Sequence, residues 1–478
     1  MKFLRVLLSL LKSYLISIGL FVNLLVLGAI LYYGVDTGAQ RAGHVLGALA
    51  KHLSGGTAAA RLPGTRAGAD LKRGLPADAF AYREHDVPLE AWVGSGRVLH
   101  VGPDAEYKLP SKAARAAKEG DTILIAPGRY ATDTAVWTAD HLYIKGDGGL
   151  VSVDARGAAV AEGKAIWVTK SNHVRIENVE FMNAAVPDQN GAGIRAEGDY
   201  LHVVGCYFHD NESGLMSRNN ADAEIVVDYS EFARNGSPNG QAHQIYAGTI
   251  AKLTVRGSFL HHAQIGSDLK SRAVENRVLY NRIMDGSDGR DNYSIDLSEG
   301  GRAFIVGNVI QQGATGENYH LIAFAPERAF GATHELYAVN NTLVNDRDDG
   351  VFIWNNTDAT AWVYDNVFAG PGEIVRGPAV IAGNVITPAK RSALPWKGSG
   401  FDEETESRNR LVDQAGFRSR AEFDYTLVPG AAAADAAVDL PALEGESLVP
   451  EFEPRPPLGL TRRATDAKRD AGAFELAR

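Results

Sequence analysis

Short strand-like segments recur along this chain at nearly constant spacing, and this repeat limits the fold more than any other feature. Eight segments alternate apolar and polar residues and close on a large apolar residue. The closing residues are Phe181, Phe208, Phe232, Leu260, Ile283, Ile310, Leu343 and Phe368, separated by 27, 24, 28, 23, 27, 33 and 25 residues. A period of about 25 residues built from strands is typical of a solenoid whose coils stack on one another.

The composition of the repeat selects one kind of solenoid. The leucine consensus of leucine-rich repeats is absent, and a propeller blade needs about 40 residues. We therefore predict an all-β fold, a right-handed parallel β-helix over residues 91–385, followed by an irregular extension over 386–478 that packs on it. A helix over 111–118, before a strand over 122–126, is expected to cap the open end. Four asparagines at turns are expected to form ladders and to adopt the left-handed conformation: Asn178, Asn308, Asn341 and Asn366.

A second series of strands lies between the first, and its alternation predicts which side chains face outward. The inward aliphatic positions are Ile194, Leu215, Ile245, Leu269, Ile295, Ile322 and Phe352. The residues that follow them should point outward: Arg195, Met216, Tyr246, Lys270, Asp296, Ala323 and Ile353. The residues that precede three of the aliphatics are also expected to point outward: Gln244, Asp268 and Ser294.

This arrangement predicts a polar cluster around Lys270. Tyr246 and Asp296 would flank it on the adjacent coils, about 4.8 Å away at the backbone. Asp268 and Arg272 would flank it on its own strand. Ionisable side chains at the sheet edge and in nearby loops add to the cluster: His243, Tyr293, His320, His261, His262, Asp285, Asp288 and Asp291. The alternative is a solvated solenoid surface, on which such ion pairs contribute little to stability.

Such a set suits the removal of a weakly acidic proton beside a carboxylate, as at C5 of a uronic acid before elimination of the C4 oxygen. The carboxylate must be neutralised, and the base must lie within hydrogen-bond reach of the proton. We expect Lys270, Tyr246, Arg272 and His243 to be catalytic, with Arg272 on the substrate carboxylate and Tyr246 or His243 as the acid or an alternative base. We expect the substrate-binding residues to be Asp268, Asp296, Tyr293, Gln244, His262, His320 and Arg195.

Two stretches resemble known families. The run "AARAAKEGDTILIAPGRY" before the strand coils is similar to the start of β-helix proteins of the pectate-lyase-like superfamily. The run "LKSRAVENRVLYNRI" resembles the chondroitinase B and alginate lyase family, and this resemblance implies that Lys270 is the Brønsted base. One coil later the chain reads "YSIDLSEGG", with Asp296 where the resemblance implies an arginine.

The N-terminus reads as a membrane anchor. Lys2, Arg5 and Lys12 precede an apolar run over 14–33 that is long enough to cross a bilayer. We predict an uncleaved inner-membrane helix over 1–34, a linker over 35–90 and the remaining chain in the periplasm. Secretion after signal-peptide cleavage is the alternative.

The composition limits which partners, disulfides and cofactors the chain can have. A net charge of −10 argues against a nucleic-acid partner, and one cysteine, Cys206, excludes an internal disulfide and suggests a buried thiol. No cofactor is expected to be required, and a close-spaced zinc motif is absent. Ca²⁺ held by Asp285, Asp288 and Asp291 is an alternative.

The preferred function is a lyase acting on an acidic polysaccharide. The alternatives are a C5-epimerase, a glycoside hydrolase using Asp268 and Asp296, and a glycan-binding scaffold.

Overall fold

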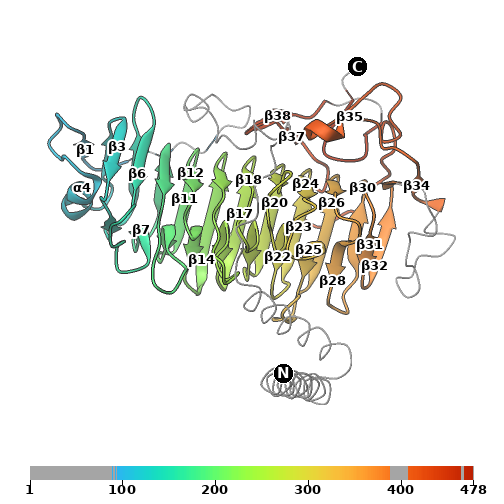
Figure 1. Ribbon diagram of the computed structural model, residues 1–478, viewed down its shortest axis with the longest axis horizontal. Coiled ribbons are helices and arrows are strands. Elements are labelled where there is room, and N and C mark those ends of the chain that lie inside the picture. Colours follow the sequence, from blue (N-terminus) through green and yellow to red (C-terminus); the bar gives the residue numbers. More distant parts are fainter. Residues whose placement is uncertain (1–88, 90–91, 93, 388–406, 465–467, 477–478) are drawn as a thin grey trace, which may run out of the picture. The chain divides into compact units, whose positions relative to one another are not determined.

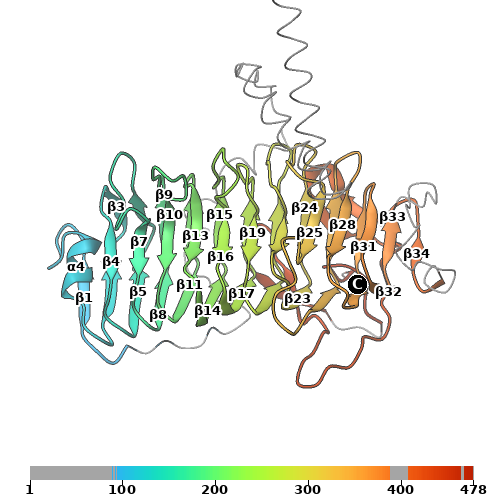
Figure 2. The same ribbon diagram turned by 90° about the horizontal axis from the view of Figure 1, so that it is seen from below.

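The chain folds as a parallel β-helix, as the repeat predicted (Figures 1 and 2). The computed structural model describes residues 89, 92, 94–387, 407–464 and 468–476. Successive strands pass from a first sheet to a second and then a third, so each regular coil contributes one strand to each sheet. Every neighbouring pair within these three sheets is parallel, for example β16 with β19 and β19 with β22.

The strands of the first sheet are, in spatial order, β1 (Val98–Val101), β2 (Thr122–Ile125), β5 (Leu142–Gly146), β8 (Val174–Glu177), β11 (Tyr200–Val204), β14 (Asn220–Asp228), β17 (Ile250–Arg256), β20 (Glu275–Leu279), β23 (Arg302–Val306), β26 (Glu335–Val339), β29 (Ala361–Tyr364) and β32 (Ala379–Ala382). Those of the second sheet are β3 (Gly128–Ala131), β6 (Val151–Asp154), β9 (Val179–Met182), β12 (Tyr207–His209), β15 (Glu231–Ala233), β18 (Phe259–His261), β21 (Arg282–Met284), β24 (Val309–Gln312), β27 (Thr342–Asn345), β30 (Val367–Ala369), β33 (Val385–Thr387) and β34 (Arg410–Leu411). Those of the third sheet are β4 (Ala135–Trp137), β7 (Ala165–Thr169), β10 (Ala192–Ala196), β13 (Ser213–Ser217), β16 (Ile245–Ala247), β19 (Leu269–Ser271), β22 (Ile295–Leu297), β25 (His320–Phe324), β28 (Val351–Asn355) and β31 (Glu373–Arg376).

The eight closing residues of the repeat pair in register along the second sheet, from Phe181 to Phe368. Their side chains fill the interior. The ring of Phe208 stacks on those of Phe181 and Phe232, with centroids 5.1 Å and 4.6 Å apart. Because each coil alone cannot bury its apolar side chains, stacking of the coils supplies the core.

The predicted inward series of the third sheet is correct from Ile194 to Ile322 and wrong at its last member. Ile322 pairs with Ile353, not Phe352, so Trp354 rather than Ile353 continues the outward column. The run "VFIW" is apolar at every position, and alternation therefore does not fix its register.

An asparagine ladder runs along the turn between the first and second sheets. Asn308 donates its side-chain amide to Asn341 Oδ1 at 2.9 Å, and Asn341 repeats this contact with Asn366 at 3.0 Å. The full ladder comprises Asn281, Asn308, Asn341, Asn366, Asn384 and Asn409.

The sequence predicted an asparagine ladder but assigned the left-handed backbone conformation to the asparagines themselves. Of the four predicted asparagines, Asn178 alone has a positive φ, of 56°. For five of the six ladder asparagines, Asn409 being the exception, the left-handed position belongs to the residue immediately before, such as Gly307 with φ 68° or Asn340 with φ 53°. Cys206 is a buried thiol, as expected, and burial raises its pKa to about 12.

The N-terminal end of the β-helix is covered by helix α4 (Pro110–Ala116), one residue earlier at its start than predicted and two shorter at its end. Asp133 Oδ2 accepts a hydrogen bond from the Ser111 N–H at 2.9 Å, which satisfies one free donor at the start of the helix. Its buried face includes Ala113 and Ala114, which join the main core. The helix therefore acts as the cap that a solenoid end requires.

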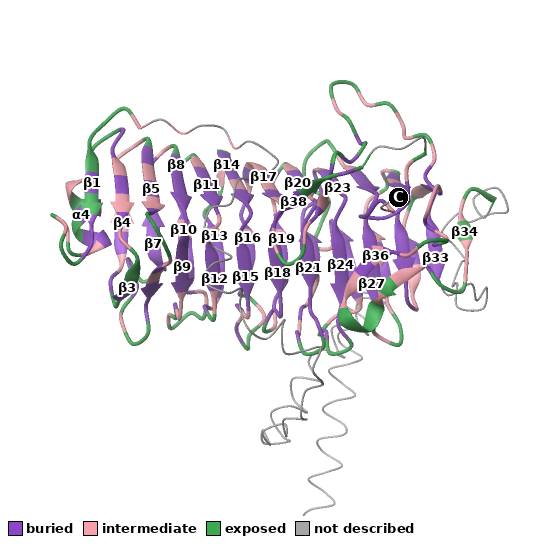
Figure 3. Ribbon diagram, turned by 90° about the horizontal axis from the view of Figure 1, so that it is seen from above, coloured by how far each residue is buried: buried purple, intermediate pink, exposed green. Residues whose placement is uncertain are grey.

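The C-terminal extension packs on the outside of the first and second sheets (Figure 3). Leu448, Phe452 and Leu460 form one apolar cluster with Tyr280 and Phe304. The regular elements of the extension are β35 (Phe417–Ser419), the 3₁₀ helix η3 (Arg420–Glu422), β36 (Asp424–Leu427), β37 (Phe452–Pro454) and β38 (Leu460–Arg462).

The predicted anchor over 1–34 lies outside the described residues, as does almost all of the predicted linker. Within the described ranges, no helix has both the length and the apolar character needed to cross a membrane.

Candidate active site on the third sheet

Three adjacent strands bring the predicted column together. Tyr246 on β16 is in register with Lys270 on β19, which is in register with Asp296 on β22. Tyr246 and Lys270 are half-buried, whereas Asp296 is buried. The column therefore has the order and spacing that the sequence predicted.

Lys270 is held by two carboxylates. Its Nζ donates to Asp296 Oδ2 at 2.6 Å and to Glu327 Oε1 at 2.8 Å. Ser298 Oγ donates to the second oxygen of Asp296 at 2.8 Å. Lys270 therefore forms ion pairs with one buried carboxylate, Asp296, and one exposed carboxylate, Glu327.

Arg272 lies directly after β19 and binds both Tyr246 and Glu327. Its Nη1 donates to Tyr246 Oη at 2.6 Å, and its Nη2 donates to Glu327 Oε2 at 2.6 Å and Oε1 at 2.9 Å. Glu327, in the turn after β25, therefore accepts hydrogen bonds from both Lys270 and Arg272. The Glu327 side chain is 45% exposed, while those of Lys270 and Arg272 are 13% and 18% exposed.

The two carboxylates differ in their electrostatics. Burial raises the pKa of Glu327, but hydrogen bonds and charges from Lys270 and Arg272 outweigh burial and lower the pKa overall. At Asp296, burial is the stronger influence and raises the pKa, although Lys270 and Ser298 act against it. The site therefore offers one easily ionised, accessible carboxylate and one buried carboxylate.

His243 is part of the site but is held neutral. Its ring stacks on Tyr246 with centroids 5.8 Å apart, and its Nδ1 accepts a hydrogen bond from the Ser267 N–H at 2.9 Å. Burial, followed by the charges of Lys270 and Arg272, lowers its pKa to about 3. His243 supports the Tyr246 ring and is poorly suited to deliver a proton near neutral pH.

The remaining predicted residues on this sheet lie at the two ends of the column. Arg195 lies two strands before Tyr246, is half-buried, and has Glu197 Oε1 3.8 Å from its Nε. At the other end, His320 lies between Trp354 and Tyr293, with ring centroids 4.7 Å and 6.0 Å away. Tyr293 lies just before β22, the strand of Asp296, and His320 and Trp354 lie one and two strands further on. The half-buried rings of Tyr293 and Trp354 offer a surface against which a sugar ring can stack.

Three predicted outward residues are buried instead. Gln244, Asp268 and Ser294 each come immediately before a strand, at the corner between the second and third sheets, and none exposes any surface. Gln244 Nε2 donates to Asp268 Oδ1 at 2.9 Å. The alternation of a strand does not extend into the preceding corner, and the prediction that these three side chains point outward was wrong.

His262 and the expected carboxylate pair of Asp268 and Asp296 also do not lie where the sequence predicted. His262 is buried beside His261, with their Nδ1 atoms 2.7 Å apart, and its Nε2 lies 3.4 Å from Asp288 Oδ1. It follows β18 of the second sheet. Asp268 does not share the outer face with Asp296, so the carboxylate pair expected for a hydrolase is not formed.

The acidic residues of the following loop divide into two groups. Asp285 and Asp291 lie with Asp268 in a buried cluster whose potential ligand oxygens are all within 4.8 Å of one another. Asp288 faces His262 and is not in that cluster. Of the three residues expected as an alternative Ca²⁺ site, Asp285 and Asp291 therefore lie together, whereas Asp288 lies apart from them.

Glu327 and Trp354 were missed as site residues by the sequence reasoning. Glu327 lies in an irregular turn, "APERAFGATHE", with no periodicity to indicate where its side chain points. Trp354 was displaced by the one-residue register error in β28. The regular spacing of the coils predicts where residues on strands lie. A turn residue reaches the same face through the path of its loop, which the spacing does not predict.

Comparison with known proteins supports the fold. No protein-family model matches the chain. Pectate lyase Pel9A has a similar structure, with a TM-score of 0.50 and 13% sequence identity over 80% of this chain and 98% of that one. A PL6 family alginate lyase, AlyGC, is also similar, with a TM-score of 0.33 and 16% identity over 63% of this chain and 41% of that one. At the level of fold, the predicted likeness to pectate-lyase-like β-helix proteins is confirmed.

Among curated sequences, the chain is similar to SHC SH2 domain-binding protein 1 homologs A and B of Xenopus laevis. The identity is 24% over 185 and 187 residues, respectively. The matched part is 37% of this chain and covers only 25% of each relative.

Proposed function

We propose that this protein is a polysaccharide-active enzyme, and that it cleaves a uronate-containing polymer by β-elimination at the third sheet. One observation carries the proposal: Lys270 and Arg272 jointly bind a carboxylate, that of Glu327, on an otherwise sheltered face. Two cations that converge on one carboxylate oxygen are what a lyase needs to hold and neutralise a uronate beside the reacting carbon.

Within this proposal the residues have distinct roles. The substrate carboxylate takes the place of Glu327 between Lys270 and Arg272. Tyr246 lies on the other side of Arg272, whose guanidinium stabilises negative charge on the Tyr246 oxygen at 2.6 Å. Tyr246, as the phenolate, accepts the C5 proton and becomes the phenol. The C5–H electron pair forms the C4–C5 double bond, the C4–O bond breaks, and the phenol returns the proton to the leaving C4 oxygen. Lys270 stays paired with Asp296 when the substrate displaces Glu327. Its role is therefore to hold the substrate carboxylate by its positive charge.

This assignment changes the role that the sequence resemblance implied for Lys270. The Lys270 Nζ donates to Asp296 at 2.6 Å and to Glu327 at 2.8 Å, so it is positioned to bind a carboxylate. The aspartate stands where the resemblance implied an arginine. Asp296 thus supplies an anion where the resemblance implied a cation. The second cation is Arg272, which lies directly after the strand of Lys270.

The reaction class is tested with purified protein and a panel of uronate polymers. New absorbance near 235 nm reports unsaturated ends and supports the lyase. Deuterium incorporation at C5 in D₂O without chain cleavage would instead support a C5-epimerase. New reducing ends without that absorbance would support a hydrolase, and binding without any product would support a glycan-binding scaffold.

We further propose that residues 1–34 anchor the enzyme in the inner membrane with the β-helix in the periplasm. The proposal rests on the apolar run over 14–33 and the positive charges before it. Membrane fractions washed with alkaline carbonate should retain the protein, and protease added to spheroplasts should digest it. Release of a shortened chain into the medium would contradict the anchor.

A further inference from the structure

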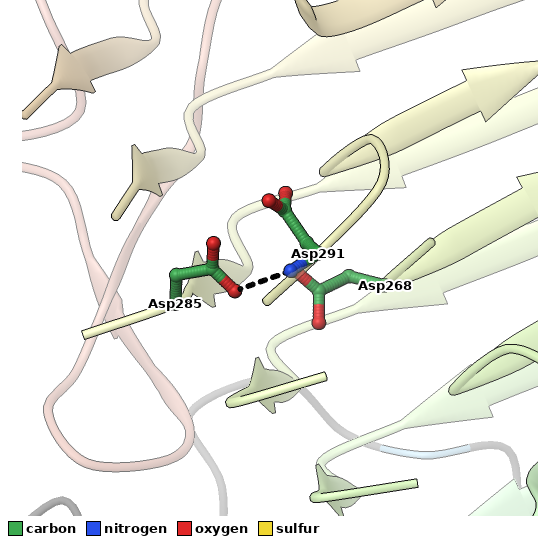
Figure 4. Close-up of side chains that lie close together, drawn as sticks. All are labelled: Asp268, Asp285 and Asp291. Atoms are coloured by element: carbon green, nitrogen blue, oxygen red, sulfur yellow. Dashed lines mark hydrogen bonds between the residues drawn. The ribbon is translucent and has the colours of Figure 1, made fainter. Parts of the chain in front are cut away.

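Three aspartates lie together in the interior, away from the substrate face. Asp268 precedes β19, and Asp285 and Asp291 belong to the loop between β21 and β22. All three expose no surface, and one carboxylate oxygen of each lies within 4.8 Å of those of the other two. Figure 4 shows the three side chains close together, with Asp285 Oδ1 accepting the Asp291 backbone N–H at 3.2 Å. Burial raises the pKa of each carboxyl. Three buried carboxylates at contact distance repel one another unless a counter-charge is present.

The polar atoms around this cluster are incompletely satisfied. Asp268 accepts one hydrogen bond, from Gln244, and its Oδ2 has no hydrogen-bond partner. Asp291 accepts Ser294 Oγ at 2.9 Å on one oxygen, and its Oδ1 has no hydrogen-bond partner. Gln312, at the end of β24, also has a buried carbonyl oxygen without a partner, and its side chain interacts with Asp291. Native interiors rarely leave so many acceptors unpaired in one place.

The positive charge within reach is insufficient for three carboxylates. Among the described residues, no lysine, arginine or histidine nitrogen forms an ion pair with Asp268, Asp285 or Asp291 within 4.0 Å. Arg347 lowers the pKa of Asp291 by its charge, but its Nη1 donates to the Gly316 carbonyl. A divalent cation together with Arg347 would balance three carboxylates.

We propose that Asp268, Asp285, Asp291 and Gln312 bind a buried divalent cation, with Ca²⁺ as the best fit. All four offer hard oxygen ligands, which Ca²⁺ takes at about 2.3–2.6 Å. Carboxylate oxygens within 4.8 Å of one another can therefore surround a single ion. The cation fixes the corner that leads into β19, two residues before Lys270. It is a structural site, separate from the carboxylate-binding face.

Binding is measured on the full-length chain, purified in detergent, stripped with EDTA and dialysed. We expect about one Ca²⁺ per chain by elemental analysis. We also expect Ca²⁺ to raise the melting temperature by roughly 3 °C at a concentration 100 times its dissociation constant, with Mg²⁺ less effective. Absence of bound Ca²⁺ together with an unchanged melting temperature would overturn the proposal.

Conservative variants separate a cation site from a cluster that merely shares protons. Asp268→Asn and Asp291→Asn should abolish the Ca²⁺-dependent shift. Each should melt at or above metal-free wild type in EDTA, because a buried negative charge is removed. Asp288→Asn, in the same loop but outside the cluster, should retain the full shift. A Ca²⁺ shift that survives Asp291→Asn would show that the ion binds elsewhere and would refute the site.

Discussion

At the scale of single residues, the central feature is a carboxylate bound by two cations. Glu327 is the most exposed member of the network and the easiest to displace, since it lies on a turn and not on a strand. Its contacts with Lys270 and Arg272 are those expected of a substrate carboxylate. Under the proposed function, Glu327 fills the anion site of the free enzyme, and a uronate substrate has to compete with it.

Replacing Glu327 tests this competition. Glu327→Gln removes the negative charge but keeps the side-chain size, so a uronate substrate should bind more tightly. We expect KM to fall by roughly 3- to 10-fold with kcat changed less, as suits a partly exposed ion pair. The matched control is Glu335→Gln, which removes the partner of Arg302 on the first sheet, 2.8 Å away. A large fall in kcat for Glu327→Gln would show that Glu327 takes part in the chemistry instead.

At the scale of elements, the asparagine ladder aligns the coils at the turn between the first and second sheets. Asn308 Oδ1 accepts the Asn281 backbone N–H at 2.8 Å, and Asn308 Nδ2 donates to the Val278 carbonyl at 2.8 Å. We expect Asn308→Ala to lower the free energy of unfolding by about 2–4 kcal/mol, because it leaves buried backbone groups unpaired. Urea denaturation measures the change. The exposed Asn239→Ala should cost under about 1 kcal/mol, and equal losses for the two variants would contradict a special role of the ladder.

Buried histidines on the third sheet give the fold a defined response to acid. Burial lowers the pKa of His243 and of His320 to about 3, from an ordinary value of 6.5. The unfolded chain binds protons at these positions below pH 6.5 while the folded chain does not. Their contribution to stability is therefore full above pH 6.5 and declines as the pH falls towards 3.

We expect the free energy of unfolding to fall by about 2 kcal/mol for each of these histidines between pH 7.5 and pH 5. Urea denaturation at the two pH values measures the difference. His243→Gln should reduce the pH dependence by its own share, since glutamine does not titrate. An unchanged pH dependence in this variant would show that His243 binds a proton equally well in both states.

The sequence predicted strand positions well and corner positions badly, for a physical reason. Along a strand, side chains alternate, so an aliphatic Leu269 inside places Lys270 outside. At the corner the backbone changes direction, and Asp268 turns into the interior where alternation had placed it outside. The turn that carries Glu327 has no periodicity at all. The column of Tyr246, Lys270 and Asp296 was therefore predictable, whereas its carboxylate partner was not.

At the scale of the whole molecule, the C-terminal extension covers aromatic side chains that the solenoid leaves outside. Leu460 is fully buried against the cluster containing Tyr229, Tyr280 and Phe304. Leu460→Ala should lower the free energy of unfolding by about 2–4 kcal/mol through loss of burial and a cavity. A chain that ends at Thr387 should bind more of a hydrophobic dye than the full-length protein. Unchanged dye binding would mean that the extension does not protect this surface.

The most direct test of the account is the rate at which absorbance near 235 nm appears on a cleavable uronate polymer, compared across four proteins. Arg272→Ala and Tyr246→Phe should each lose at least about 100-fold relative to wild type, since one removes the carboxylate clamp and the other the base. Lys252→Ala, on β17 of the first sheet, should retain wild-type rates. Wild-type rates in both Arg272→Ala and Tyr246→Phe would contradict the assignment of the active site to the third sheet.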